Sequence, residues 1–195
     1  MIHEFTERRL WSGGVDVSDG LRRHLLELVP ASTRLRDPSA EEDGHGTDLW
    51  VDRRDLPPLS VDFKHRSYCP IERWGIDDAC IETCSVYKGP WPNDGSGKRV
   101  KCGWTIDATK RTDIVVYTWP AGFEDVRRFW ILWFPALCSA AIRSMPEWQR
   151  RYRERPAQNN GYSTLNVYVP RVEIVNAMRP LLSGVAASHD EPVPF

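Results

Sequence analysis

Three residues, Asp48, Asp62 and Lys64, have the types and spacing needed to hold a divalent cation beside a positively charged side chain. Asp62 and Lys64 are two residues apart in a β-rich run, so both side chains emerge on one face of a strand. Asp48 opens another β-rich run, and a hairpin would bring its carboxylate beside Asp62. Adjacent carboxylates repel each other unless a cation lies between them, and their hard oxygens suit Mg²⁺ or Mn²⁺.

A lysine ammonium beside such a cation can orient water and stabilise the charge that develops on a phosphate. These residue types together therefore predict hydrolysis of a phosphodiester. Glu82, in a later strand-like run, is expected to face the same way as Cys80 and Cys84 and could supply a third carboxylate. The alternative is a solvent-facing strand on which Asp62 and Lys64 form an ion pair of little energetic value.

The elements that position these residues are predicted from hydrophobic periodicity and turn signals. A first helix is expected to start at Ser18 and Asp19 and to bury a stripe made of Leu21, Leu25, Leu28 and Val29. Polar stretches that contain glycine or proline predict loops at 35–47 and 89–99. Strands are predicted at 48–51, 59–64, 80–87, 113–119, 128–134 and 164–169, with a hairpin connection at 53–58.

Two further helices are predicted to follow prolines. Pro135 opens one helix, Pro146 divides it, and a basic segment continues to Arg155, whereas Pro170 opens the last helix through Met178. The order of the elements predicts a single α/β domain over 1–183, with a central mixed β-sheet flanked by helices. Residues 184–195 are expected to form a flexible tail.

Composition and charge restrict the class of protein. With 195 residues, 41% hydrophobic and 27% charged, the chain has the length and composition of one water-soluble domain. The formal net charge of −1 excludes a general polycation but allows a local basic groove. Basic residues gather at 98–101, 110–111, 127–128 and 150–155, where the alternative is an ordinary solvated surface.

Cysteine usage and the lack of an export signal predict a cytoplasmic protein with free thiols. The five cysteines include no CxxC pair, which disfavours a metal–thiolate site, although a thiol or zinc protein stays open as an alternative. The longest apolar run, 129–137, is too short to cross a bilayer, so no membrane partner is expected.

The segments Gly46-Thr-Asp48-Leu-Trp-Val51 and Val61-Asp-Phe-Lys64 resemble the PD-(D/E)XK nuclease superfamily, which includes many restriction enzymes and phage or repair nucleases. The resemblance extends over about 44–175, although threonine rather than proline precedes Asp48. It continues through Ile81-Glu82-Thr-Cys-Ser85, Gly103-Trp104, Thr112-Asp113-Ile-Val-Val-Tyr117 and 160–170.

This resemblance implies a restriction-endonuclease-like fold and a Mg²⁺-dependent nuclease, with DNA as the expected substrate. Asp48, Asp62, the carbonyl of Phe63 and Glu82 would hold the metal, and Lys64 would orient the attacking water. The alternative function is a catalytically inactive nuclease-fold module that binds nucleic acid or protein in a phage or mobile-element setting. The oligomeric state stays open, with a homodimer as one arrangement.

Further residues are candidates for contacts with substrate or for additional site acids. Arg66 would share the face of Asp62 and Lys64 if the strand continues. For each of the others an ordinary structural role is an alternative: an exposed loop, a core edge, a helix surface or the cap of a strand. These candidates are Lys110, Arg111, Tyr162 and Thr164 for substrate, and Glu27 and Asp113 for the site.

Overall fold

The computed structural model describes residues 19–39, 42, 47–65, 69–90, 96–118, 129–159 and 161–186. Its described residues divide between two compact units, each assembled from separate stretches of the chain. The first unit contains the described residues up to Trp74 together with Thr109–Pro135. The second contains Gly75–Ala108 and the described residues from Ala136 onward.

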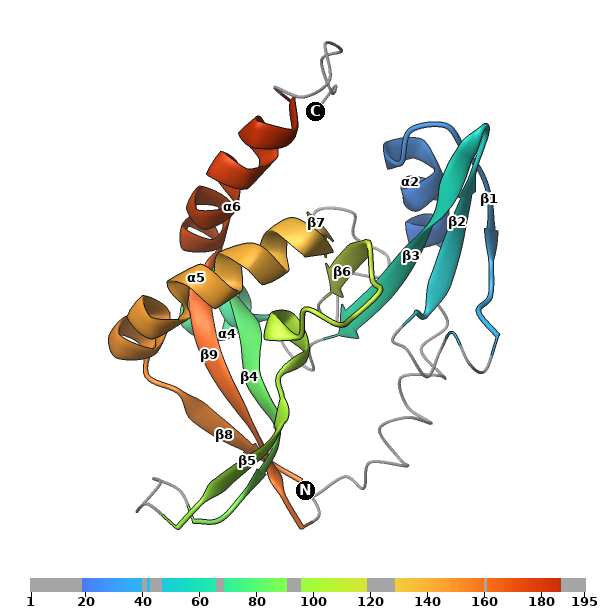
Figure 1. Ribbon diagram of the computed structural model, residues 1–195. Helices are drawn as coiled ribbons and strands as arrows, with labels where there is room; N and C mark the ends of the chain where they lie inside the picture. Colours follow the sequence, from blue (N-terminus) through green and yellow to red (C-terminus); the bar gives the residue numbers. More distant parts are fainter. Residues whose placement is uncertain are drawn as a thin grey trace. The chain divides into compact units, whose positions relative to one another are not determined.

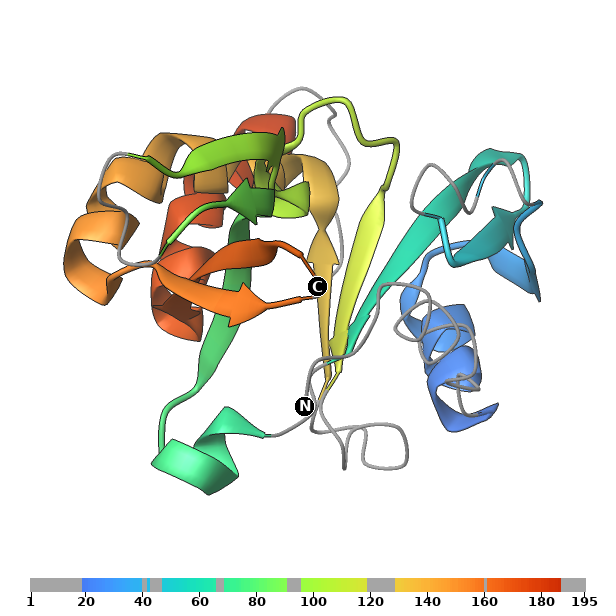
Figure 2. The same ribbon diagram turned by 90° about the horizontal axis from the view of Figure 1, so that it is seen from below.

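The first unit is built on a mixed five-stranded sheet with the strand order β1-β2-β3-β6-β7 (Figures 1 and 2). β3 and β6 are parallel, and the other neighbours are antiparallel. β1, β2 and β3 form an antiparallel meander, and β6, which is distant from it in sequence, pairs with β3 at its edge. The elements are α2 (Asp19–Leu28), β1 (Ser32–Arg36), β2 (Leu49–Arg53), β3 (Leu56–His65), α4 (Pro70–Trp74), β6 (Ile114–Thr118) and β7 (Phe129–Trp133).

Alternation along the strands gives this sheet one face that packs into a hydrophobic core with α2. Phe63 borders the core, whereas Leu28, predicted to be buried, is the last residue of α2 and is 59% exposed. The side chains between these core positions point to the opposite face of the sheet. The buried core residues are Leu21, Leu25, Val29, Leu49, Val51, Val61, Ile114 and Val116.

The second unit is built on an antiparallel four-stranded sheet with the order β5-β4-β9-β8. β4 and β9 bury matching positions, with Ala79 opposite Val169 and Ile81 opposite Val167. Helix α5, which starts in the first unit, buries a helical stripe that includes Leu137, Ala141 and Trp148. The elements are β4 (Asp78–Lys88), β5 (Lys98–Cys102), η1 (Trp104–Ile106), α5 (Phe134–Tyr152), β8 (Arg155–Gln158), β9 (Ser163–Pro170) and α6 (Arg171–Ala186).

The α/β class and the mixed sheet flanked by helices are thus confirmed, but the strands form two sheets rather than one. The predicted loop at 35–47 gives its first two residues to β1, and the predicted loop at 89–99 gives Lys98 and Arg99 to β5. Both strands lack an alternating apolar pattern, which is why they read as loops.

Prolines account for the other differences. The turn expected at 53–58 shrinks to Arg54 and Asp55, and Pro57 and Pro58 belong to β3. β6 pairs with β3 only from Val61 to His65, so at the two prolines one side of β3 has no partner among the described strands, and a missing N–H is tolerated.

In the helices, Pro146 does not divide α5, and Pro180 lies inside α6, which continues to Ala186. Pro146 is exposed, as is Ile142, whose carbonyl loses its helical donor, so water can satisfy that carbonyl. α5 instead ends at Tyr152, where Arg153 adopts a left-handed φ of 45°. The predicted tail is helical over 184–186, and its remainder lies outside the described residues.

Within the described ranges, no helix combines the length and the apolar character needed to cross a membrane.

Candidate active site

The β2–β3 hairpin brings Asp48 beside Asp62. Leu49 pairs with Val61 and Trp50 with Ser60, so the residue before Leu49 lies opposite the residue after Val61. The backbone N–H of Asp48 donates to the carbonyl of Val61 (2.8 Å), and Asp48 Oδ2 accepts from the backbone N–H of Phe63 (2.6 Å). The two carboxylates predicted to converge therefore do so, on the sheet face opposite the α2 core.

Two lysines neutralise Asp62, which is only 2% exposed. Lys64 Nζ lies 2.5 Å from Asp62 Oδ1, as expected for side chains two apart on one strand. Lys110 Nζ lies 2.6 Å from Asp62 Oδ2. The lysine side chains are themselves largely buried, at 26% and 15% exposure for Lys64 and Lys110. We refer to Asp48, Asp62, Lys64 and Lys110 as the acid–lysine cluster.

The two aspartates of the cluster differ in their affinity for a proton. Asp48 is exposed as a residue, but desolvation of its carboxyl group, followed by the neighbouring charge of Asp62, raises the pKa of Asp48 to about 6. Burial alone would also raise the pKa of Asp62, yet the ammonium groups of Lys64 and Lys110 outweigh it and lower that pKa. Asp62 is thus held as a carboxylate, whereas Asp48 carries the cost of the like-charge neighbour.

The parallel pairing of β3 with β6 delivers Lys110 to this cluster. Asp113, just before β6, accepts at Oδ2 from the backbone N–H of Ser60 (2.8 Å). The single hydroxyl hydrogen of Ser60 is shared between the carbonyl of Arg111 (2.7 Å) and Asp113 Oδ2 (3.0 Å). These bonds hold the segment that carries Lys110 against β3. Asp113 therefore connects the start of β6 to β3. This is the strand-capping role that was given above as the alternative to a role in the site.

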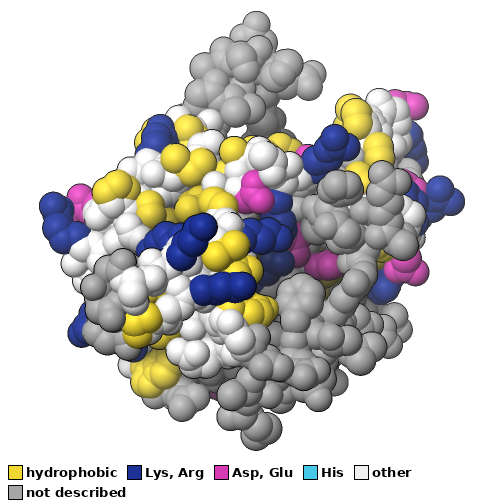
Figure 3. Space-filling model, turned by 60° about the horizontal axis from the view of Figure 1, so that its bottom comes forward, with side chains coloured by type: hydrophobic (Ala, Val, Ile, Leu, Met, Phe, Trp, Pro, Cys, Tyr) yellow, Lys and Arg dark blue, Asp and Glu magenta, His cyan; other side chains and the backbone are white. Residues whose placement is uncertain are grey.

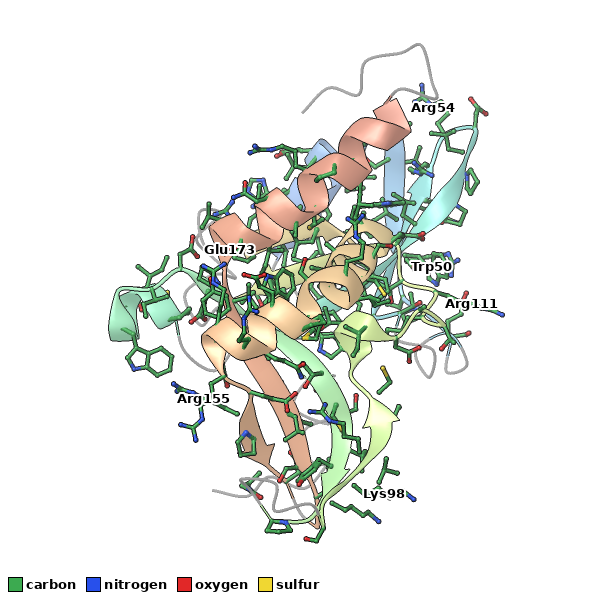
Figure 4. The ribbon with its side chains drawn as sticks, turned by 60° about the vertical axis from the view of Figure 1, so that its left-hand side comes forward. Trp50, Arg54, Lys98, Arg111, Arg155 and Glu173 are labelled. Atoms are coloured by element: carbon green, nitrogen blue, oxygen red, sulfur yellow. The ribbon has the colours of Figure 1, made fainter. Side chains whose placement is uncertain are left out.

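The contact of Lys110 with Asp62 was not predicted. The sequence suggested only that Lys110 contacts phosphate or lies in an exposed loop. Arg111, its neighbour, is exposed, and its side chain is labelled in Figure 4. Glu27 lies on the surface of α2 and is paired with His24 (3.1 Å), in agreement with the helix-surface interpretation. Arg66 lies outside the described residues.

Glu82 lies in β4, in the unit that does not contain the cluster. Its Oε1 accepts from Ser85 Oγ (2.5 Å) and from the backbone N–H of Trp104 at the start of η1 (3.2 Å). Gly103 allows this approach, since a Cβ there would lie 2.0 Å from the backbone oxygen of Glu82. Glu82 thus has a structural task in its own unit.

Glu82, Cys80 and Cys84 were predicted to face the same side of their strand, and this prediction is wrong for Cys84. The pairing of β4 with β9 shifts between Glu82 and Cys84, which breaks the two-residue alternation. Cys84 is fully buried, whereas Cys80 and Glu82 are half-buried. Tyr162 and Thr164, also in this unit, are half-buried; the carbonyl of Tyr162 accepts from the backbone N–H of Asn159 (2.8 Å).

The donor chemistry of the two aspartates fits a hard divalent cation. Mg²⁺ is commonly bound through one or two carboxylates, with water and phosphate oxygens as the other ligands. The repulsion between Asp48 and Asp62, which helps to raise the pKa of Asp48, is the cost that such a cation would remove. No group of three or more His, Cys, Asp or Glu side chains is placed for metal in the part of the chain described.

The cysteines stand apart from this chemistry. Cys69, Cys80, Cys84, Cys102 and Cys138 are all free thiols. Burial raises the pKa of Cys102 and of Cys138, so these thiols are held in their protonated, less reactive form.

Comparisons with known proteins do not place the chain in a family. No protein-family model, no curated protein and no solved structure matches it. The residues of the acid–lysine cluster are therefore the basis on which a function can be proposed.

Proposed function

We propose that the chain is a metal-dependent nuclease that hydrolyses phosphodiester bonds, with DNA as the expected substrate and Mg²⁺ or Mn²⁺ as the cation. The observation that carries this proposal is the acid–lysine cluster, in which Asp48 and Asp62 oppose each other across a hairpin beside Lys64. A mixed sheet with a helix packed on one face and the acids on the other supports a restriction-endonuclease-like fold of the PD-(D/E)XK type.

Each residue of the cluster has a role in this proposal. Asp48 and Asp62 would hold the cation, and the resemblance adds the carbonyl of Phe63 as a ligand. A bound cation would polarise a phosphate oxygen and acidify a nearby water molecule. Lys64 would orient that water and stabilise the charge that develops on the phosphate. The role expected for Glu82 stays a prediction, because Glu82 belongs to the other unit.

The proposal is tested by cleavage of plasmid and linear DNA in Mg²⁺, with Asp48→Asn and Lys64→Met as variants. Both substitutions nearly preserve side-chain shape and remove the charge. Each should lower the cleavage rate by ~100-fold or more, the scale on which one group that stabilises a transition state acts.

The matched control is Asp55→Asn, which makes the same chemical change in the exposed turn of the same hairpin. Asp55 has a φ of 57°, a conformation that asparagine tolerates well, so this variant should keep the wild-type rate. Equal cleavage by the wild type and both cluster variants would reject the nuclease assignment.

One observation favours the second candidate, a catalytically inactive module that binds nucleic acid. Two aspartates and two lysines make the cluster formally neutral, and both oxygens of Asp62 already have ammonium partners. The carboxylate of Asp62 is therefore satisfied without a cation. This candidate predicts binding of nucleic acid that is the same in EDTA and in Mg²⁺, with no cleavage in either.

A further inference from the structure

Lys110 occupies an oxygen that the proposed cation would need. Its Nζ lies 2.6 Å from Asp62 Oδ2, while Lys64 takes the other oxygen of the same carboxylate. Asp62 is almost fully buried, so few other directions are open for a new ligand. A divalent cation at this carboxylate therefore competes directly with an ammonium group of the protein.

The competition is strong because the charges would nearly touch. Mg²⁺ binds carboxylate oxygens at about 2.0–2.1 Å, so a cation on Asp62 would lie within a few ångströms of both ammonium groups. Two like unit charges about 4 Å apart repel each other even in bulk water, by enough to change an affinity several-fold. One ammonium group should therefore move when a cation binds.

Lys110 is better placed to move than Lys64. Lys64 projects from β3 only two residues from Asp62, whereas Lys110 belongs to the non-strand segment before β6. Lys110 Nζ also lies 6.0 Å from the centre of the Phe134 ring, whose face attracts a cation. Lys110 thus has a second favourable contact close to its present position.

We propose that Lys110 is the internal counter-ion of Asp62 in the metal-free protein and that a divalent cation displaces its ammonium group. This inference rests on the cation site of the proposed function. It assigns Lys110 a positioning role: the ion pair balances the charge of Asp62 and holds its carboxylate in place until the cation arrives. The displaced ammonium group is then available to an anionic ligand such as a phosphate.

The affinity of the protein for Mn²⁺, measured by calorimetry without nucleic acid, tests this role. Lys110→Met removes the competing charge while keeping the length of the side chain. It should tighten Mn²⁺ binding by about ten-fold, as expected for loss of one like charge near contact distance in an aqueous environment. Circular dichroism and thermal unfolding establish that the variant is folded.

Arg111→Met is the matched control for this affinity measurement. It removes one positive charge from the adjacent, exposed residue, where salt screens the effect. Affinity for Mn²⁺ should change by less than about two-fold in this variant. Equal tightening in both variants would overturn the counter-ion role while leaving the cation site intact. Failure of the wild type and both variants to bind Mn²⁺ would instead refute the cation site itself, and the counter-ion role with it.

A second measurement uses only the wild-type protein, so it does not depend on the folding of a variant. Lysine acylation is read by peptide mass spectrometry with and without Mn²⁺. Release from Asp62 should make Lys110 at least several-fold more reactive in Mn²⁺, with a smaller change at Lys64. Unchanged reactivity of Lys110 at a saturating concentration of Mn²⁺ would overturn the proposal.

Discussion

Asp48 binds a proton more tightly in the folded protein than in the unfolded chain, since its pKa rises from 3.8 to about 6 on folding. Protonation in this window therefore favours the folded state. We expect the free energy of unfolding of the metal-free protein to contain a contribution that is fully present below pH ~4 and is lost as the pH rises to about 6. Urea unfolding in EDTA across this range measures it.

Asp48→Asn should remove this contribution, so the variant should gain stability relative to the wild type as the pH rises from 4 to 6. Asp52→Asn is the control on the same strand. A hydrogen bond from Arg34 (2.6 Å) lowers the pKa of Asp52, so its contribution changes below pH ~4 instead. A stability difference between Asp48→Asn and wild type that is constant across the window would contradict the prediction.

The positions of Asp48, Asp62 and Lys64 could be predicted because they depend on local structure. One short connection separates the two β-rich runs, and alternation along a strand then decides which side chains share a face. The place of Lys110 could not be predicted in this way. It lies 48 residues from Asp62 in sequence and reaches the carboxylate only through the parallel pairing of β3 with β6.

The β4–β5 hairpin presents two exposed lysines that we expect to contact a phosphate backbone. Lys88 and Lys98 are cross-strand partners, and both are exposed. Like charges directly opposite each other are unfavourable until an anion binds. Figure 4 labels Lys98 near the tip of this hairpin, and Figure 3 shows Lys and Arg side chains interspersed with uncharged ones on the face that comes forward.

Several other basic residues of this unit are paired with acids. Arg99 contacts Glu154, and Arg151 contacts Glu173 (2.9 Å) and Glu147 (3.9 Å). Arg150 and Arg151, in the basic segment 150–155, thus have acidic partners and are less available to DNA than the sequence suggests.

The double substitution Lys88→Gln/Lys98→Gln should weaken DNA binding in EDTA. It should also reduce the slope of log affinity against log salt by about 0.9 for each lost phosphate contact. Fluorescence anisotropy at several salt concentrations measures both effects. A comparison with Arg150→Gln, which removes a charge partnered by Glu147 (3.4 Å), separates the hairpin from general loss of charge. If the double variant and Arg150→Gln show the same slope, the hairpin does not bind the backbone, and its lysines are ordinary solvated residues.

Elements with regular apolar patterns could be predicted, and elements without them could not. All five residues of β5 are exposed, so neither alternation nor hydrophobicity marks this strand. The irregular pairing of β4 between Glu82 and Cys84 likewise leaves no local signal, because a bulge is decided by the partner strand. The side of β4 that Cys84 faces could therefore not be inferred from the spacing alone.

Each compact unit combines segments that are far apart in the chain. The first unit needs β6, because Ile114 and Val116 are buried in the same core as Val61 and α2. The sequence predicts a single sheet, because strand order in a sheet depends on such non-local pairing, which no local pattern encodes. The division of the chain between two units follows from the same pairing.

A fragment that ends at Trp74 should therefore fail to fold by itself. It would leave the side of β3 that pairs with β6 without its partner from Val61 to His65, and it would expose the core positions that β6 covers. We expect the isolated fragment 1–74 to show no cooperative thermal transition by circular dichroism. Coexpression with 75–195, which carries β6 and β7, should restore a soluble complex with a cooperative transition. Cooperative unfolding of fragment 1–74 alone would mean that the meander and α2 form a sufficient core. β6 would then serve to bring Lys110 to the acid–lysine cluster and would not be required for folding.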